Sequence, residues 1–429
     1  MLDHAPLSDG CENGKILPLY ILEPSLWKQP DVSYRHFLYL QHYVSQLDEM
    51  FIKKGSRLVI KVGEALPVLK SLANRHNIKK IFSHYETWNK FSKDRDAAIR
   101  KWTEENSIDW LEYQQNGVVR NLDSRDRWST LWHNHMRKRI YAVPEKIFCI
   151  PEDSDNLPSS QDLQLKFDGF EPNTTFGKTE PGIVLKSFLS ERGENYQKEM
   201  SGPMLSVDSC SRLSTHIAFG TISIRTIFQR TQEQTKKRPD LVGDKIKNWR
   251  ASYNSFQKRL RWHCHFIQKL EDLRSIEWKN IHPIYDNLER ETAYSENFER
   301  WKRGETGFPF VDACMRSLIS TGWINFRMRA MLVSFASYNL WIDWRQTSLY
   351  LARLFSDYEP GIHYSQVQMQ SGTTGINTIR IYNPIKQGLE HDPQGKFIKK
   401  WVPELKHMPV ANVHTCLLYT SDAADDDHC

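Results

Sequence analysis

The sequence predicts an α/β domain with a doubly wound parallel sheet, followed by an all-helical domain. Three observations support this fold class. Short apolar runs alternate with helical patterns up to about residue 142, a stretch rich in Pro, Asp and Ser follows, and helical periodicity then continues to about residue 405. Strands that alternate with helices are typical of a parallel sheet, because each crossover connection requires a helix.

The first half contains four predicted strands and the helices between them. The runs KILPLYIL, SRLVIKVG, KKIFSHYE and IDWLEY are short, apolar and rich in β-branched and aromatic residues, which indicates strands; they lie at 15–22, 56–63, 79–86 and 108–113. Apolar residues at helical spacing predict helices at about 35–54, 65–77 and 93–106.

The two ends of the chain differ from its body. Residues 1–14 predict a loop and a short helix, whereas a doubly wound domain normally opens on a strand. We therefore expect a sheet that lacks its first, central strand; an ordinary polar N-terminal arm is the alternative. The segment TCLLYTSDAADDDHC at 415–429 resembles translated adapter sequence, so we expect a non-native tail there and no metal site.

Composition shifts set the predicted domain boundaries. The segments PEDSDNLPSSQD and FEPNTTFGKTEP are typical of a long surface linker between two domains. We expect an α/β domain at 1–142, a linker at 143–181, a helical domain at 182–408 and a tail at 409–429.

The overall composition is that of a soluble intracellular protein. Hydrophobic residues make up 39% and charged residues 26%, and the net charge of +6 permits an anionic partner without requiring one. The seven Cys form no CxxC pair, which is typical of a reducing compartment and gives no sign of a zinc site. No apolar run is long enough to span a membrane. The aromatic share of 12%, with 14 Trp, indicates either a large helical core or stacking and electron-transfer chemistry.

Two segments of the helical half carry candidate binding chemistry. Ser209–Ser223 places several hydroxyls before a helix, which suits a phosphate group or simple helix capping. Lys245–Lys269 has seven Lys or Arg and no Asp or Glu, interleaved with Trp249, Tyr253 and Phe256. This pattern favours a nucleic-acid backbone and unstacked bases, with a solvated basic helix face as the alternative.

Four further stretches carry a specific resemblance. They are SRLSTHIAFGTIS at 211–223, TGFPFVDACMRSL at 306–318, FRMRAMLVSFASYNLWIDWR at 326–345, and RIYNP with HDPQGKFIKKWVPEL at 380–405. Together they resemble the cryptochrome/DNA photolyase family, in order over nearly the whole chain and less closely in the α/β half. The resemblance implies a helical domain that binds FAD and works with blue light.

Roles at individual positions follow from that resemblance alone. It implies that FAD is contacted by Tyr196, Cys210, Ser211, Arg212, Leu213, Ser214, Arg329, Asp357, Glu359 and His363. Arg329 is expected to pair with Asp357. Glu359 stands where the family has Asp, and His363 stands where photolyases have Asn. An imidazole at 363 could exchange a proton near neutral pH.

The resemblance also implies a DNA partner, in the form of UV-damaged DNA with pyrimidine dimers. Trp262, Arg327 and Arg380 match positions that face the lesion or its phosphates, and we add Arg259 and His263 as DNA-binding candidates. The catalytic candidates are Arg259, Trp262, Trp344 and His363, with Trp344 as the middle member of the family's electron-relay tryptophans.

Three departures from the family pattern bear on function. Arg259 replaces the Glu by which dimer-repairing enzymes bind the damaged base, and a guanidinium can only donate hydrogen bonds. Val367 replaces the relay Trp nearest the flavin, and Phe326 replaces an Asn near flavin and substrate. Trp323 or Tyr364 could substitute as electron carriers, as could Trp341; packing in the core is the simpler role for the two tryptophans.

The sequence therefore favours a DNA photolyase and leaves two alternatives open. A light-sensing cryptochrome without repair activity is favoured by Arg259 and Val367, and a basic helical scaffold without flavin would be colourless. The chain is expected to act as a monomer without a membrane partner. An antenna chromophore, folate or deazaflavin, would lie in the α/β half, where no residue pattern assigns either.

Overall fold

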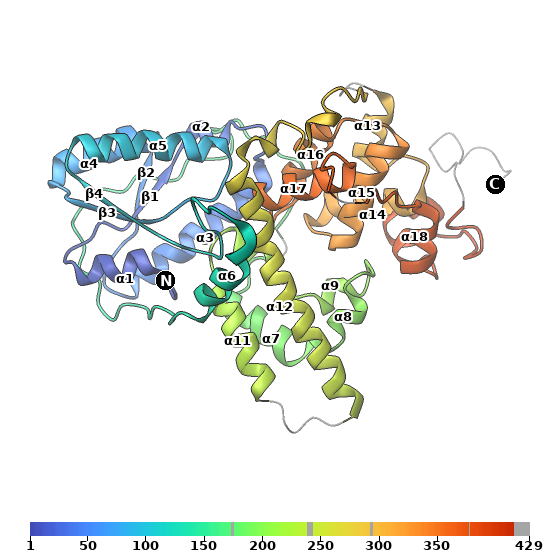
Figure 1. Ribbon diagram of the computed structural model, residues 1–429, viewed down its shortest axis with the longest axis horizontal. Helices are drawn as coiled ribbons and strands as arrows, with labels where there is room; N and C mark the ends of the chain where they lie inside the picture. Colours follow the sequence, from blue (N-terminus) through green and yellow to red (C-terminus); the bar gives the residue numbers. More distant parts are fainter. Residues whose placement is uncertain (173–175, 238–242, 292–294, 377, 416–429) are drawn as a thin grey trace.

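The computed structural model describes residues 1–172, 176–237, 243–291, 295–376 and 378–415. It divides into an N-terminal α/β half with parallel strands and a largely helical half, as the sequence predicts. Figure 1 shows the strands with α4 and α5 on one side and α1 and α3 on the other, and the helical half beside them. No helix of the described part is long and apolar enough to cross a membrane.

The four strands form two separate parallel pairs. β1 (Leu19–Leu22) pairs with β2 (Val59–Val62), and β3 (Lys80–His84) pairs with β4 (Asp109–Tyr113). Each lies within a segment predicted as a strand. The helices of this half are α1 (Ala5–Glu12), α2 (Pro24–Trp27), α3 (Tyr34–Ile52), α4 (Ala65–His76), α5 (Lys90–Glu105) and α6 (Trp128–Arg137).

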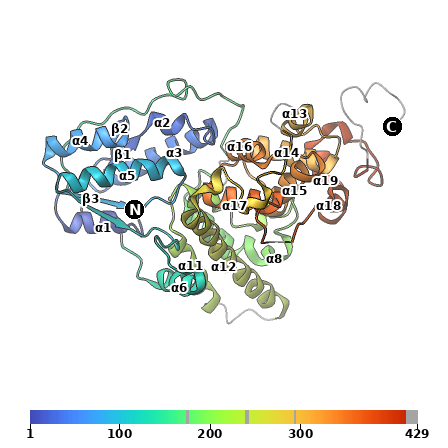
Figure 2. The same cartoon turned by 45° about the horizontal axis from the view of Figure 1, so that its top comes forward.

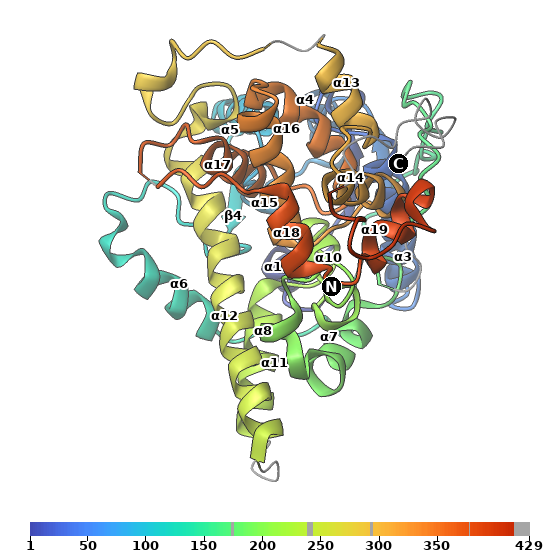
Figure 3. The ribbon, with the colours of Figure 1, turned by 90° about the vertical axis from the view of Figure 1, so that its right-hand side faces the viewer.

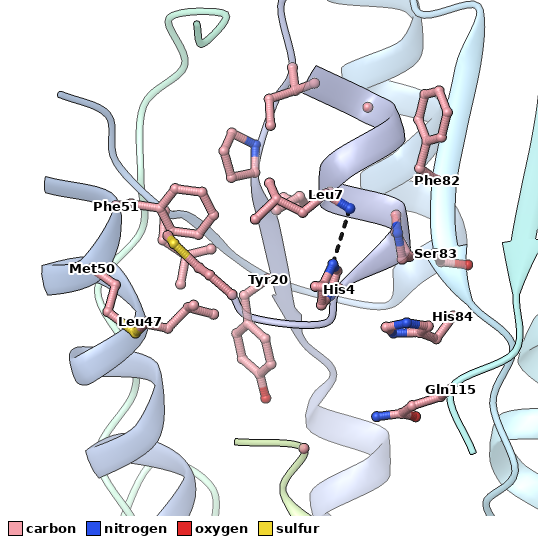
Figure 4. Close-up of a pocket in the computed structure, with 18 of the residues that line it drawn as sticks. His4, Leu7, Tyr20, Leu47, Met50, Phe51, Phe82, Ser83, His84 and Gln115 are labelled. Atoms are coloured by element: carbon pink, nitrogen blue, oxygen red, sulfur yellow. Dashed lines mark hydrogen bonds between the residues drawn. The ribbon is translucent and has the colours of Figure 1, made fainter. Parts of the chain in front are cut away.

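A cavity of about 1630 Å³ separates the two strand pairs. Figure 4 shows the side chains that point into it: Leu7 of α1, Tyr20 of β1, Phe51 of α3 and Phe82 of β3. The described residues contain no hydrogen-bonded ladder between β1 and β3.

The segment predicted as a surface linker is partly buried. Phe170 is only 2% exposed and packs against Tyr39 of α3, and Leu163 is also buried. Arg35 of α3 donates to Asp168 at 2.5 Å, which ties the segment to the α/β half. The composition of 143–181 predicted its lack of regular structure, but not these anchoring contacts.

The helical half begins at residue 181 and confirms the predicted helical periodicity. Its helices are α7 (Pro181–Ser190), α8 (Tyr196–Glu199), α9 (Ser206–Ser209), α10 (Ser214–Ala218), α11 (Ile224–Lys236), α12 (Gly243–Asp272), α13 (Glu296–Arg303), α14 (Pro309–Thr321), α15 (Phe326–Ser334), α16 (Trp344–Leu354), α17 (Pro360–Ser371), α18 (Pro384–His391) and α19 (Lys396–Trp401).

The long helix α12 packs closely against α17, as Figure 3 shows. Gly361 allows this approach, because a Cβ there would lie 2.7 Å from the Cα of Ile267. Pro360 is the first residue of α17. A backbone N–H at this position has no partner within the helix, so its absence in proline loses no hydrogen bond. The contact sets the position of the residues that α12 and α17 carry.

The loop between α16 and α17 is docked onto the α/β half, where α16 lies next to α3 (Figure 2). Ser33 Oγ donates to the Arg353 carbonyl at 2.7 Å, and Arg353 Nη1 donates to the Val32 carbonyl at 2.9 Å. The His36 ring lies 2.9 Å from the Phe355 carbonyl. The two halves therefore hold this loop jointly.

Candidate functional site

Arg329 and Asp357 form a bidentate ion pair at the centre of the helical half. Arg329 Nη1 and Nη2 donate to the two Asp357 oxygens at 3.0 and 2.9 Å, and Nε donates to the Ile324 carbonyl at 2.8 Å. Burial opposes ionisation of Asp357, but Arg329 outweighs it and lowers the pKa of the carboxyl. The carboxylate therefore stays charged, in the pair that the resemblance predicts.

The run Cys210–Ser214 is held by a residue that the sequence analysis did not single out. Arg192 Nη1 donates to the carbonyls of Asp208 and Cys210 at 2.5 and 2.7 Å, and Nη2 donates to the Ser211 carbonyl at 3.3 Å. Leu213 is fully buried. A lone Arg in a short RGEN turn carries no sequence signal for this role, because its partners are backbone groups.

Four guanidinium groups gather around the buried Cys210 thiol. Burial raises the pKa of Cys210 to about 12, while Arg212, Arg192, Arg259 and Arg329 act in the opposite direction. Only Arg329 among these four has a carboxylate partner in the described part of the chain. The site therefore holds more buried positive charge than its own acids neutralise, which suits a diphosphate.

Arg212 illustrates this surplus of positive charge. Its guanidinium lies 3.7 Å from the centre of the Trp323 ring and, among the described residues, forms no ion pair. Burial lowers the pKa of Arg212 to about 10 despite the nearby Cys210 and Asp357. Burying a cation without an anion is costly, so an anionic ligand beside Arg212 would be stabilised.

Arg259 connects the interior to an exposed aromatic surface. Its charge acts on the buried Tyr196, whose pKa is raised by burial. The same guanidinium lies 4.4 Å from the centre of the Trp262 ring and 5.2 Å from that of Phe326. Trp262 is 42% exposed and Phe326 is 44% exposed. Two flat apolar faces and a cation are thus presented together to solvent.

The structure places His263 differently from the prediction that it binds DNA. Its Nε2 lies 2.8 Å from Glu359 Oε1, and both side chains are mostly buried. Burial disfavours the charged ring, but Glu359 outweighs it and, with a bond to Cys264, raises the pKa of His263 to about 10. His263 therefore points inward as a cation that holds Glu359, a position predicted to contact the flavin.

His363 is buried and hydrogen-bonded to a backbone carbonyl. Its Nε2 lies 2.8 Å from the Ser348 carbonyl, which can only accept, so Nε2 carries the proton. Burial is the main cause that lowers the pKa of His363 to about 4. The expectation that this ring exchanges a proton near neutral pH is therefore wrong, because the buried ring stays neutral there.

The residues considered as electron carriers have different surroundings. Trp344 is almost fully buried and donates from Nε1 to Asn280 Oδ1 at 2.8 Å, and within the described ranges no aromatic ring contacts it. Val367 is buried in the core of the same half. Trp341 is 43% exposed and donates to the Glu289 carbonyl, whereas Trp323 lies under Arg212.

Most aromatic residues of the basic helix α12 are core residues. Trp249, Tyr253 and Phe256 are at most 4% exposed, so they cannot stack on bases. This corrects the sequence interpretation, in which the interleaved aromatics face a nucleic acid.

The other two residues predicted to bind DNA are Arg327 and Arg380. Arg327 has a buried Nε without a hydrogen-bond partner, and Arg380 is exposed. No described contact joins Arg380 to Arg259.

The chain matches two models of known protein families. Residues 256–428 match the model of the FAD binding domain of DNA photolyase, and residues 1–126 match the DNA photolyase model. The chain belongs to the cryptochrome/DNA photolyase family. Arg329 and Asp357 lie within the segment matched by the FAD binding domain, whereas Arg192 and Arg212 precede it in the chain.

Relatives within the family include both photolyases and cryptochromes. The deoxyribodipyrimidine photo-lyase of Salmonella typhimurium is 25% identical, over 96% of this chain and 88% of that protein. Cryptochrome DASH of Xenopus laevis is 24% identical, over 94% of this chain and 80% of that protein. The crystal structure of a Synechocystis cryptochrome superimposes with a TM-score of 0.84 at 23% identity, over 96% of this chain and 88% of that one.

The residues present fit the flavin dinucleotide that the family domain implies. The fit rests on the unneutralised Arg212 and Arg259 beside Cys210 and on the ionised Asp357. None of the residues predicted to contact FAD lines the large cavity of the α/β half. That cavity is therefore separate from the candidate site.

Proposed function

We propose that this chain is an FAD-dependent blue-light flavoprotein of the DNA photolyase type, which splits pyrimidine dimers in DNA. The observation that carries the proposal is the position of Arg259. Its guanidinium acts electrostatically on the buried Tyr196 on the inner side and lies over the rings of Trp262 and Phe326 on the outer side. One residue thus spans the distance between the candidate cofactor site and an exposed surface suited to bases.

The inner residues would hold the cofactor. Arg212 and the hydroxyls of Ser211 and Ser214 would bind the diphosphate, and the Arg329–Asp357 pair would lie at the isoalloxazine. When bound, reduced FAD supplies the light-excited electron that splits the cyclobutane ring and is afterwards returned. Because Asp357 remains ionised, it can accept a hydrogen bond from an N–H group of the ligand.

The outer residues would bind the flipped dimer and the strand that carries it. Trp262 and Phe326 offer faces on which unstacked bases can lie, and Arg259 can donate to a thymine carbonyl. Exposed cations follow along α12 and would contact phosphates: Lys245, Lys247, Arg250 and Lys258. Arg327 and Arg380 would contribute from the neighbouring segments.

A repair assay tests this proposal. The purified, chemically reduced protein is mixed with a thymine-dimer oligonucleotide, and thymine absorbance is followed under blue light and in the dark. Recovery in the light alone supports a photolyase. A yellow protein that leaves the dimer intact under both conditions overturns the repair function, and a colourless protein overturns the flavin as well.

A matched pair of variants tests the exposed surface. Trp262→Ala should weaken binding of dimer-containing DNA by about 1–3 kcal/mol, the value of one stacking contact. Trp278→Ala removes an indole that is 41% exposed and lies outside this surface, so it should leave the affinity unchanged. An equal loss of DNA affinity in the two variants would mean that any change of the surface weakens binding. Electrophoretic mobility shift assays at fixed salt measure the DNA affinity of both variants.

A second candidate function is a cryptochrome-like photoreceptor without repair activity. It is favoured by Arg259, whose guanidinium only donates hydrogen bonds where dimer-repairing enzymes have a Glu, and by Val367, which has no ring to pass an electron. In that case light would change the flavin spectrum without dimer splitting. A light-dependent change in partner binding, in a protein inactive in the repair assay, would support the receptor.

A further inference from the structure

A line of aromatic rings crosses the boundary between the two halves. The ring of Trp88, from the segment after β3, lies 5.6 Å from that of Tyr358, between α16 and α17. The Tyr358 ring lies 5.3 Å from His363, which lies 5.4 Å from Tyr364. Trp88 is half-buried, and the other three are buried. The line therefore runs from the half-buried Trp88 to Tyr364 on α17.

Tyr358 is hydrogen-bonded to a buried carboxylate from the other half. Its hydroxyl donates to Asp31 Oδ2 at 2.6 Å, a length typical of a bond to an ionised acceptor. Asn89 donates to the same oxygen at 3.2 Å, whereas Asp31 Oδ1 is buried without a hydrogen-bond partner. Asp31 Oδ2 is therefore the acceptor that faces the Tyr358 hydroxyl.

This arrangement has a redox consequence. A phenol that loses an electron becomes a strong acid, so its oxidation is easy only where a base accepts the proton at once. Burial raises the pKa of Tyr358 well above its ordinary value, with Tyr364 and Asp31 adding to the shift, so loss of the proton alone is disfavoured. Coupled loss of electron and proton is the route that the Asp31 contact permits.

The family pattern assigns electron transfer to other positions of the chain. The residues at those positions are poorly placed to supply electrons. Val367 has no ring, and Trp344 contacts no other ring in the described part of the chain. The guanidinium of Arg345 lies 4.7 Å from the centre of the Trp344 ring, and a cation there makes removal of an electron less favourable. Trp88 and Tyr358 have no such obstacle.

We propose that Tyr358 and Asp31 form a proton-coupled electron donor for the flavin site, with Trp88 as its outer end. The inference rests on the flavin of the proposed function. Photoexcited oxidised flavin is the oxidant: one electron leaves the Tyr358 ring, the phenolic proton passes to Asp31 Oδ2, and a neutral tyrosyl radical remains. A thiol in solution returns the electron through Trp88, and Asp31 returns the proton to the Tyr358 oxygen.

His363 lies between this donor and the Arg329–Asp357 pair. Its ring contacts Tyr358, and its pKa responds to both Arg329 and Asp357. Because the ring stays neutral and donates to the Ser348 carbonyl, it adds no charge that would trap the electron. The donor therefore lies next to the residues proposed to surround the flavin.

The test is a blue-light flash on the FAD-loaded full chain, in the oxidised state and without DNA. Transient absorption and freeze-quench electron paramagnetic resonance should detect a neutral tyrosyl radical. Tyr358→Phe should reduce that signal at least tenfold. Tyr350→Phe is the matched control, because this half-buried hydroxyl donates at 2.6 Å to the Lys302 carbonyl instead of to a carboxylate, and it should leave the signal unchanged.

Asp31→Asn separates a chemical role from a structural one. It keeps the shape but removes the base, so radical formation should slow at least tenfold and lose its solvent deuterium isotope effect. A tyrosyl signal that persists in Tyr358→Phe, or a rate unchanged in Asp31→Asn, overturns the proposal. A yellow protein without any tyrosyl signal overturns this donor alone, whereas a colourless protein overturns the flavin function and the donor together.

Discussion

At the residue scale, the stability of the site depends on the charges of the His263–Glu359 pair. A buried imidazolium is stable only while its carboxylate partner is present, and here the two atoms are 2.8 Å apart. The pair also fixes Glu359, which stands where the family has the shorter Asp. Stability of the site should therefore depend on pH in a range where most proteins change little.

His263→Gln should remove this pH dependence. The folded pKa of His263 is raised to about 10 from an ordinary 6.5, so the pair stabilises fully below pH 6.5 and its contribution is lost as pH rises toward 10. The variant leaves Glu359 without a cation and should cost about 2 kcal/mol at pH 6. Melting temperatures of the variant and the parent should converge near pH 10.

A neighbouring histidine provides the control for that series. His265→Gln changes a ring on the same helix whose pKa is lowered to about 4, mainly by burial, so the ring is neutral throughout the range. Its melting temperature should run parallel to that of the parent. Parallel curves for His263→Gln as well would mean that His263 is uncharged at neutral pH.

The sequence predicted single residues well where the family motif carried them. Arg329 and Asp357 were expected to pair and do so. His263 and Tyr358 have no such signal, because their partners come from elements far apart in the chain. The direction in which a residue of α12 points depends on how that helix packs against α17, and a basic segment alone does not show this.

At the element scale, the contact between α12 and α17 depends on one glycine. Gly361→Ala would place a Cβ 2.7 Å from the Ile267 Cα, and backbone cannot move aside as a side chain can. We expect a loss of about 1–3 kcal/mol in the free energy of unfolding, as for other overpacked cores. Urea unfolding measures it, and FAD retention should fall in parallel because α17 carries His363.

Gly202→Ala is the matched substitution for this prediction. The nearest atoms to a Cβ at 202 lie 3.8 Å away, which is ordinary contact, so the variant should unfold like the parent. If both variants lost the same stability, loss of glycine flexibility and not the α12–α17 contact would be responsible.

The elements themselves were largely predictable, and the connecting segment was not. Periodicity located all four strands and the main helices because each buries one face. The segment at 143–181 has a polar composition, yet Phe170 and Leu163 are buried against the α/β half. The composition of a segment averages over all of its residues, so it does not reveal that two apolar side chains anchor the segment.

At the scale of the whole molecule, a buried ion pair joins the N-terminal segment to the helical half. Asp3 accepts from Arg225 Nε at 2.9 Å and from Ser223 Oγ at 2.5 Å. The Asp3 and Arg225 side chains are only 1% and 6% exposed. Removal of one partner leaves the other charge buried and unpaired.

Asp3→Asn should therefore destabilise the whole protein. We expect a loss of about 3–5 kcal/mol in the free energy of unfolding, since Arg225 keeps its charge in a buried place. Calorimetry should record it as a lower melting temperature. The exposed pair Arg230–Glu233 gives the comparison: Glu233→Gln should cost at most about 1 kcal/mol. Similar costs in both variants would contradict the buried role of Asp3.

The arrangement of the two halves was beyond sequence reasoning. Asp31 and Tyr358 are 327 positions apart and belong to segments that the sequence assigned to different domains. Nothing in either segment's composition indicates the other as a partner. Contacts of this kind arise from shape and from the need to satisfy buried polar groups, which only the folded molecule defines.

The split between the two strand pairs has a consequence for the behaviour of concentrated solutions. Within the described residues, β1 and β3 each have one edge without a strand partner, and residues of both strands line the cavity. Unpaired main-chain groups at a sheet edge are templates for adding a foreign strand. Self-association during synthesis or concentration would therefore begin in the α/β half, by capture of extended polypeptide, and would leave the helical half intact.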